Sequence, residues 1–226
     1  MSSKLPIKVE EQLQKFFSKH PLSKYRKGEI ILRPNDVPQN ILYLNSGYVR
    51  MFQVFENGKE LTLNIFRPGS YFSIVWAISK YENTFYFQAM TAVEAYRAPK
   101  DEVLNLLKTH PDLLLELTTR MVTGIYSIMS NVEQLLSTNA YKRVASILVI
   151  LAKRFGEVTS MKRTLITLSL SHEDIAQLIN LTRETTSIEM KKLMEEKLIF
   201  YKRRLIIVND LEKLRAVSFV TNINEE

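Results

Sequence analysis

The chain has 226 residues, of which 46% are hydrophobic and 24% are charged, and its formal net charge is +7. This length fits two compact domains, and this composition lies far from that of disordered chains. Because cysteine is absent, disulfides, thiolate metal sites and cysteine nucleophiles are excluded. The excess of basic residues suits a polyanionic partner such as nucleic acid, although many basic proteins never bind one.

Nothing in the sequence predicts a targeting or membrane segment. The first residues lack the continuous apolar core of a signal peptide, and no apolar run reaches the ~18 residues that a membrane span requires. We therefore expect a cytoplasmic protein without a membrane partner.

The first part of the chain has the pattern of a β domain. A short amphipathic segment carries Val9, Leu13, Phe16 and Phe17, and short β runs follow over residues 25–98. Turn signals separate these runs at Gly28, Gly47, Asn57-Gly58 and Pro68-Gly69. Asn-Gly between two apolar runs predicts a two-residue hairpin turn in which both residues take positive φ. We therefore predict an antiparallel β sandwich or roll.

Helical periodicity begins at Pro99, with a helix expected over 101–108 and a long one over about 112–136. Seven positions of the long helix recur at alternating spacings of four and three, which is typical of a two-stranded coiled-coil seam. They are Leu114, Thr118, Met121, Ile125, Ile128, Val132 and Leu135. We predict that this helix joins two copies of the chain. The alternative is an amphipathic helix packed on its own domain.

A polar break at Ser137, Thr138 and Asn139 has helix-capping chemistry and precedes another amphipathic helix over about 140–155. We place the domain boundary there. Residues 1–138 form the β domain with its dimerisation helix, and residues 139–226 form the second domain.

Residues 171–196 divide into two helices around a tight turn. Ser171 and Asp174 form a capping box, which predicts a helix over about 172–179. Asn180 stands where a helix-turn-helix needs a residue that tolerates the left-handed region, and Thr182 is placed to cap the second helix.

The second helix has two different faces. Thr186, Met190 and Leu193 share one face and are expected to be buried against the first helix. The opposite face carries residue types that read base edges in the major groove, namely Arg183, Glu184, Ser187 and Ile188. A solvated helix with mixed charges would show the same pattern, so the helix alone leaves both interpretations open.

Residues 198–208 favour DNA recognition. Two apolar runs flank Lys202, Arg203 and Arg204, which predicts a hairpin with three cations at its tip, as in the wing of a winged helix. We predict that these cations contact the phosphate backbone. A further group of predicted backbone contacts consists of Ser171, His172, Thr182 and Lys191.

Over nearly its whole length the chain resembles the cyclic-AMP receptor protein and fumarate-nitrate regulator (Crp/Fnr) family. The matching segments are KGEIILRPND, LYLNSGYVRMF, ENGKELTLNIFRPGSYF, the long helix, and SHEDIAQLINLTRETTSIEMKKLMEEKLI, within which TRET is the most specific. The resemblance implies an α+β fold with an N-terminal effector-binding jelly roll, a dimerisation helix and a C-terminal winged helix-turn-helix. It also implies a homodimeric transcription regulator that reads a near-palindromic operator with TGA-like half-sites and has RNA polymerase as a partner.

Departures from the family pattern concern the effector. Members that bind cyclic nucleotides hold the phosphate with a Gly-Glu pair and an Arg-Ser pair, and the corresponding positions here are Ser73-Ile74 and Asn83-Thr84. Without the Arg there is no charge-assisted clamp, so we expect an effector other than cyclic AMP. Haem would need His20, His110 or His172, and no proximal pair is evident, so no cofactor or metal is expected.

Aromatic residues are dense over residues 71–87. They could line an apolar effector pocket between the roll and the long helix, or they could be ordinary core. The candidate pocket residues are Tyr71, Phe72, Ser73, Trp76, Asn83, Thr84 and Phe85.

The sequence argues against two other classes of function. An effector-binding module could act through protein partners without a specific DNA site, but Arg183 and Glu184 together with a basic wing argue against this. An enzyme is not expected, because three histidines without a placed nucleophile, metal-ligand spacing or phosphate loop assemble no reaction centre.

Overall fold

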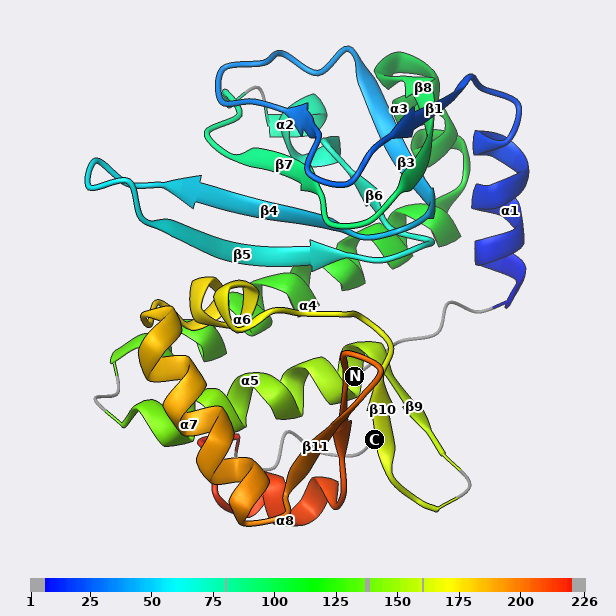
Figure 1. Cartoon of the computed structure of the whole chain (residues 1–226). Helices are drawn as coiled ribbons and strands as arrows, with labels where there is room; N and C mark the ends of the chain where they lie inside the picture. The colour runs from blue at the N-terminus through cyan, green and yellow to red at the C-terminus, as the bar shows by residue number, and fades with distance from the viewer. Residues whose placement is uncertain (1–6, 80, 137–138, 160, 221–226) are drawn as a thin grey trace. The chain divides into compact units, whose positions relative to one another are not determined.

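The computed structural model describes residues 7–220 apart from residues 80, 137, 138 and 160 (Figure 1). These residues fall into two compact units that meet within one long helix, between Ile125 and Tyr126. The domain boundary expected at 138/139 lies beyond the end of this helix and stays a prediction.

The N-terminal unit is a β roll with three flanking helices. Its elements are α1 (Ile7–Phe17), β1 (Leu22–Tyr25), β2 (Ile30–Leu32), β3 (Asn40–Ser46), β4 (Val49–Val54), β5 (Glu60–Phe66), β6 (Tyr71–Phe72), α2 (Ile74–Ser79), β7 (Tyr86–Ala89), β8 (Val93–Pro99) and α3 (Lys100–Thr109). Two four-stranded sheets have the orders β1-β8-β3-β6 and β2-β7-β4-β5. Every strand pair in them is antiparallel, which confirms the predicted β roll.

Aromatic rings fill the space between the two sheets. Phe72 and Phe87 stack with their centroids 5.3 Å apart, and Phe66 packs against both. Trp76 on α2 closes the stack by meeting Phe87 edge to face at 5.5 Å. Such offset and edge contacts stabilise a core beyond the area that they bury.

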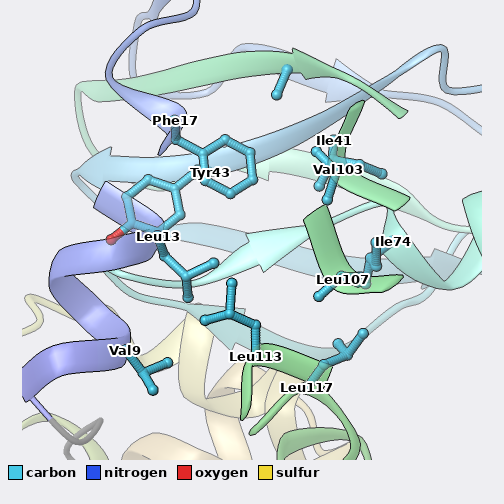
Figure 2. Close-up of a cluster of buried hydrophobic side chains, with 11 residues drawn as sticks. Val9, Leu13, Phe17, Ile41, Tyr43, Ile74, Val103, Leu107, Leu113 and Leu117 are labelled. Atoms are coloured by element: carbon cyan, nitrogen blue, oxygen red, sulfur yellow. The ribbon is translucent and has the colours of Figure 1, made fainter. Parts of the chain in front are cut away.

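A second cluster attaches the helices to the outside of the roll (Figure 2). Phe17 of α1 stacks on Tyr43 of β3 with the ring centroids 4.9 Å apart. The amphipathic N-terminal segment is a helix, and its Val9, Leu13 and Phe17 are buried. Leu113 and Leu117, in the first turns of the long helix α4 (Pro111–Leu136), join the same cluster.

The hairpin between β4 and β5 forms at Asn57-Gly58, but its turn differs from the prediction. Phe55 N donates to Lys59 O at 2.9 Å and Gly58 N donates to Phe55 O at 2.9 Å. Gly58 has φ +76, whereas Asn57 is absent from the described residues with positive φ. The loop therefore has three residues with glycine in the left-handed position, and the expectation of positive φ at Asn57 was wrong.

The C-terminal unit contains a helix-turn-helix and a small sheet. After α4 come α5 (Ala140–Phe155), β9 (Gly156–Val158), β10 (Thr164–Ile166), α6 (His172–Ile179), α7 (Arg183–Glu195), β11 (Ile199–Lys202), β12 (Leu205–Val208) and α8 (Leu211–Ala216). The sheet has the order β11-β12-β10-β9. The predicted helix-turn-helix and hairpin are confirmed, whereas β9, β10 and α8 were not anticipated.

Candidate nucleic-acid interface

The turn between α6 and α7 is defined by three local devices. Ser171 Oγ accepts from Asp174 N at 3.1 Å while an Asp174 carboxylate oxygen accepts from Ser171 N at 2.8 Å, which completes the predicted capping box. Asn180 adopts φ 50 and ψ 46 at the end of α6. Thr182 Oγ1 accepts from Thr185 N at 3.1 Å and so caps α7.

Helix α7 turns one face inward. Thr186, Met190 and Leu193 are each 0% exposed, as expected from their spacing. Glu189 is also buried, and its carboxylate accepts from Lys192 Nζ at 2.9 Å. The burial of Thr186, Met190 and Leu193 fixes the rotation of the helix about its own axis.

The opposite face of α7 is open. Arg183, Glu184 and Lys191 are exposed, Ile188 keeps 56% of its surface exposed, and Ser187 is half-buried. The side chains predicted to read bases therefore share one outward face of a firmly packed helix. An exposed helix face with donors, acceptors and an apolar group has the composition needed in a major groove.

The wing is a hairpin whose turn carries two consecutive arginines. Lys202 pairs with Leu205, and between them Arg203 and Arg204 have φ 50 and φ 67. Two successive left-handed residues are typical of a type I′ turn, which favours Asn and Gly. All three cations of the tip are exposed. The backbone thus accepts a strained turn with cations at the most exposed part of the hairpin.

His172 lies differently from its expected position at the phosphate backbone. Its Nδ1 is 2.7 Å from Ser187 Oγ and its Nε2 is 3.0 Å from Tyr201 OH. Burial, and then the nearby charge of Arg183, lower the pKa of His172. Both ring nitrogens have protein partners, so the ring joins α6, α7 and β11 instead of offering a donor to a phosphate.

Two other predicted backbone contacts use their side-chain oxygens locally. Ser171 Oγ and Thr182 Oγ1 form the caps of α6 and α7. A phosphate would meet the exposed helix ends at these positions. Their assignment as backbone contacts stays a prediction.

Two side chains on α5 support the helix-turn-helix, and the sequence pattern did not predict this role for them. The buried Arg143 guanidinium donates to the carbonyl oxygens of Ile179 and Asn180, at the last turn of α6. Tyr141 OH donates to the Glu196 carboxylate, at the end of α7. Burial and this carboxylate raise the pKa of Tyr141. The only signal in the sequence was an arginine within an otherwise apolar face of α5.

The seven residues of the predicted effector pocket do not form one site. Phe72, Ser73 and Asn83 are buried in the core. Ser73 Oγ donates to Asn40 O at 2.9 Å, and Asn83 Nδ2 donates to Arg33 O at 2.7 Å and to Phe85 O at 2.9 Å. Their polar atoms therefore serve the fold, and these three residues are not among those that line the hollow beside Trp76.

Tyr71 is separate from the other pocket residues. The Arg120 guanidinium of α4 lies 5.5 Å from the centre of its ring, and Arg120 also donates to Gly69 O. Burial raises the pKa of Tyr71 to about 12. This residue helps to hold α4 against the turn before β6.

Trp76, Thr84 and Phe85 do line a hollow of about 670 Å³, on the unpredicted helix α2 and the segment after it. Its other lining residues are Val75, Ser79, Tyr81 and Glu82. Among the described residues, the lining includes one carboxylate and no positively charged side chain. Lys80, which lies between Ser79 and Tyr81 in the chain, is outside the described residues. The described lining residues therefore offer no charge-assisted partner for a phosphate. The absence of a phosphate clamp, expected from Ser73-Ile74 and Asn83-Thr84, stays a prediction.

Helix α4 presents an open apolar face within the N-terminal unit. Leu114, Met121 and Ile125 are 46%, 40% and 57% exposed, and Thr118 is exposed too. The next three predicted seam residues, Ile128, Val132 and Leu135, have side chains outside the described residues. The described half of the predicted seam is therefore free to meet another surface.

Other kinds of site are not found in the part of the chain that the structure describes. Among these residues, no three His, Cys, Asp or Glu side chains gather as metal ligands would. None of the helices described here is both long and apolar enough to cross a membrane. Of the two histidines outside the helix-turn-helix, His20 packs on Phe16, and His110 Nδ1 lies 3.0 Å from Leu106 O.

Comparison with known proteins covers both units. A family model of the Crp-like helix-turn-helix domain matches residues 142–217, and a model of the cyclic nucleotide-binding domain matches residues 22–110. The global nitrogen regulator of a Nostoc species is 30% identical over 191 residues, which are 82% of this chain and 83% of that protein. The global nitrogen regulator of Synechococcus elongatus is 28% identical over 92% of this chain and 89% of its own.

The fold is also shared with solved structures. FixK2 from Bradyrhizobium japonicum superposes with a TM-score of 0.77 at 17% identity, over 90% of this chain and 99% of that one. A CooA mutant from Carboxydothermus hydrogenoformans gives a TM-score of 0.74 at 22% identity, over 89% of each chain. With a β roll followed by a helix-turn-helix, and relatives along most of its length, the chain belongs to the Crp/Fnr family of DNA-binding transcription regulators.

Proposed function

We propose that this regulator acts as a homodimer on a near-palindromic operator, each protomer placing α7 in the major groove of one half-site. The observation that carries the proposal is the outward face of α7 together with the cationic wing of the same unit. Two recognition helices related by a two-fold axis read half-sites about one helical turn apart.

Base reading and backbone binding fall to different residues. Arg183 can donate twice to guanine, and Glu184 can accept from cytosine. Ile188 can touch a thymine methyl but cannot donate to guanine, so the base pair it faces is read by apolar contact. Lys191 and the wing cations neutralise phosphates, which raises affinity for any sequence and releases counterions.

The open face of α4 supports the dimer. Exposed Leu114, Met121 and Ile125 form an apolar stripe that a second copy of the same helix would bury. A dimer held in this way places two helix-turn-helix units on one operator.

The effector, in this proposal, is less anionic than a cyclic nucleotide. The hollow beside Trp76, Thr84 and Phe85 is its candidate site, since aromatic rings and one carboxylate line it. RNA polymerase in the cytoplasm is the proposed protein partner, as the family membership suggests.

Replacing Arg183 tests the proposed reading face. Arg183→Ala should weaken binding to the best operator by roughly 1–3 kcal/mol and binding to random DNA far less, because a bidentate base contact is lost. The matched control is Lys202→Ala, which should weaken binding to all DNA alike and reduce the slope of log affinity against log salt. An equal loss on operator and random DNA for Arg183→Ala would show that α7 docks in another way.

A further inference from the structure

A series of hydrogen bonds runs from the wing to the recognition helix through His172. Tyr201 OH on β11 lies 3.0 Å from His172 Nε2. The other ring nitrogen, Nδ1, lies 2.7 Å from Ser187 Oγ on α7. Ser187 Oγ in turn donates to Arg183 O, one helical turn earlier, at 2.8 Å. All four residues belong to the C-terminal unit.

The hydrogen-bond partners determine which atom carries each proton in this series. A serine hydroxyl has one proton and two lone pairs. Since the carbonyl oxygen of Arg183 can only accept, the Ser187 proton is directed to it. His172 Nδ1 must then carry a hydrogen and donate to Ser187 Oγ. A neutral imidazole has a single N–H, so Nε2 accepts, and the Tyr201 hydroxyl donates to it.

The surroundings keep the ring and the phenol in these states. Burial, and then the charge of Arg183, lower the pKa of His172, so the ring is neutral at neutral pH. Burial raises the pKa of Tyr201 to about 12, so its hydroxyl keeps its proton. Both groups are held in a partly desolvated position between three elements.

We propose that His172 is a specificity-determining positioning residue, which makes Ser187 a hydrogen-bond acceptor toward DNA. With its proton and one lone pair engaged, the Ser187 hydroxyl has one lone pair left for a base. In the major groove adenine and cytosine offer amino donors, whereas thymine and guanine offer O4 and O6 acceptors. Ser187 therefore selects adenine or cytosine at the base that it faces. This assignment rests on the proposed function, in which the outer face of α7 reads bases.

Without His172, Ser187 can act as either a hydrogen-bond donor or an acceptor toward DNA. Once the bond from His172 Nδ1 is lost, the Ser187 hydroxyl keeps only its bond to Arg183 O. It can leave this carbonyl and rotate to donate or accept, so it tolerates any base edge. His172→Ala should therefore relax base preference at one position of the half-site. His172→Asn keeps an amide N–H that can donate to Ser187 Oγ and should retain the preference. Tyr201→Phe removes the donor to Nε2, so the proton is no longer fixed on Nδ1 and the preference should fall partly.

The test uses the full-length protein and a panel of operators. The best operator is selected from a random DNA pool, and each half-site position is then varied through all four base pairs in competition binding. Ser187→Ala identifies the position that Ser187 reads. At that position the unsubstituted protein should prefer adenine or cytosine roughly three- to tenfold, the range of one net hydrogen bond, and His172→Ala should reduce this to within about twofold.

The outcomes separate this inference from the proposed function. If His172→Ala weakens binding to all operators and random DNA equally, His172 is a phosphate contact and the inference is overturned. If His172→Ala keeps the full base preference at the position that Ser187 reads, the inference is overturned as well. If His172→Ala unfolds, the two other variants provide the test. The inference holds if His172→Asn retains more of the base preference than Tyr201→Phe, and it is overturned if it retains no more. A failure of the proposed function appears instead in Arg183→Ala, as equal losses on operator and random DNA.

Discussion

The wing turn should become more stable and bind DNA less well when Arg203→Asn and Arg204→Gly are combined. Arg203 and Arg204 have φ 50 and φ 67. A side chain with a β-carbon in the left-handed region costs about 1–2 kcal/mol per residue, which glycine avoids and asparagine partly avoids. Glycine also loses about 0.5–1 kcal/mol through its freer unfolded chain.

The net gain in the free energy of unfolding is therefore about 1–2 kcal/mol. For a domain of roughly 60–100 residues, each kcal/mol raises the melting temperature by about 4–8 °C. Circular dichroism during heating measures this shift. Because two cations are lost per protomer, the slope of log affinity against log salt should fall by about 0.9 for each lost phosphate contact.

The matched control keeps the charge and the strain. Arg203→Lys combined with Arg204→Lys should leave both the melting temperature and the salt slope near those of the unsubstituted protein. If the Asn-Gly variant melts no higher than the Lys-Lys variant, the turn is not strained. If the two variants share one salt slope, the tip does not contact phosphates.

Three further predictions concern the dimer, the effector and pH. Ile125→Asp should dissociate the dimer and weaken operator binding together, because an unpaired carboxylate is costly in an apolar seam; sedimentation measures this, and Val37→Asp at an exposed loop is the control. Cyclic AMP should show no micromolar affinity by calorimetry, since Ser73-Ile74 and Asn83-Thr84 supply no arginine to clamp the phosphate; measurable tight binding would contradict this. The C-terminal unit should lose stability as pH falls below 6.5, the ordinary pKa of histidine, because the lowered pKa of His172 means that the folded state binds fewer protons than the unfolded state. This loss of stability should be smaller in His172→Asn. If the variant and the unsubstituted protein show the same dependence of stability on pH, His172 is not the group responsible.

Local chemistry made the helix-turn-helix predictable. The capping box at Ser171, the left-handed Asn180 and the cap at Thr182 each depend on residues within one turn, so the sequence defines the ends of α6 and α7 closely. The same holds for the wing, whose two apolar runs are short and adjacent. The heptad spacing also picked out the exposed apolar residues Leu114, Met121 and Ile125 on α4. That they form a dimer seam stays a prediction.

Tertiary contacts explain what sequence reasoning missed. Ser73 and Asn83 look like candidate ligand contacts, but their partners Asn40 and Arg33 lie more than thirty residues away, and no local pattern predicts such pairs. His172 is a residue type that often contacts phosphates, but its ring forms hydrogen bonds with Ser187 and Tyr201 inside the unit. Strands β9 and β10 have only three residues each, too few for an alternating pattern to be visible.

The contact from Arg143 to the last carbonyls of α6 limits how far the DNA-reading segment can be transplanted. A helix that ends without partners for its carbonyls is destabilised, and here a guanidinium from α5 supplies them. A chimera that exchanges only residues 171–208 with another family member would pair this arginine with a turn of different shape. The smallest DNA-binding segment that can be exchanged with its supporting contacts therefore begins at Ala140 and includes α5.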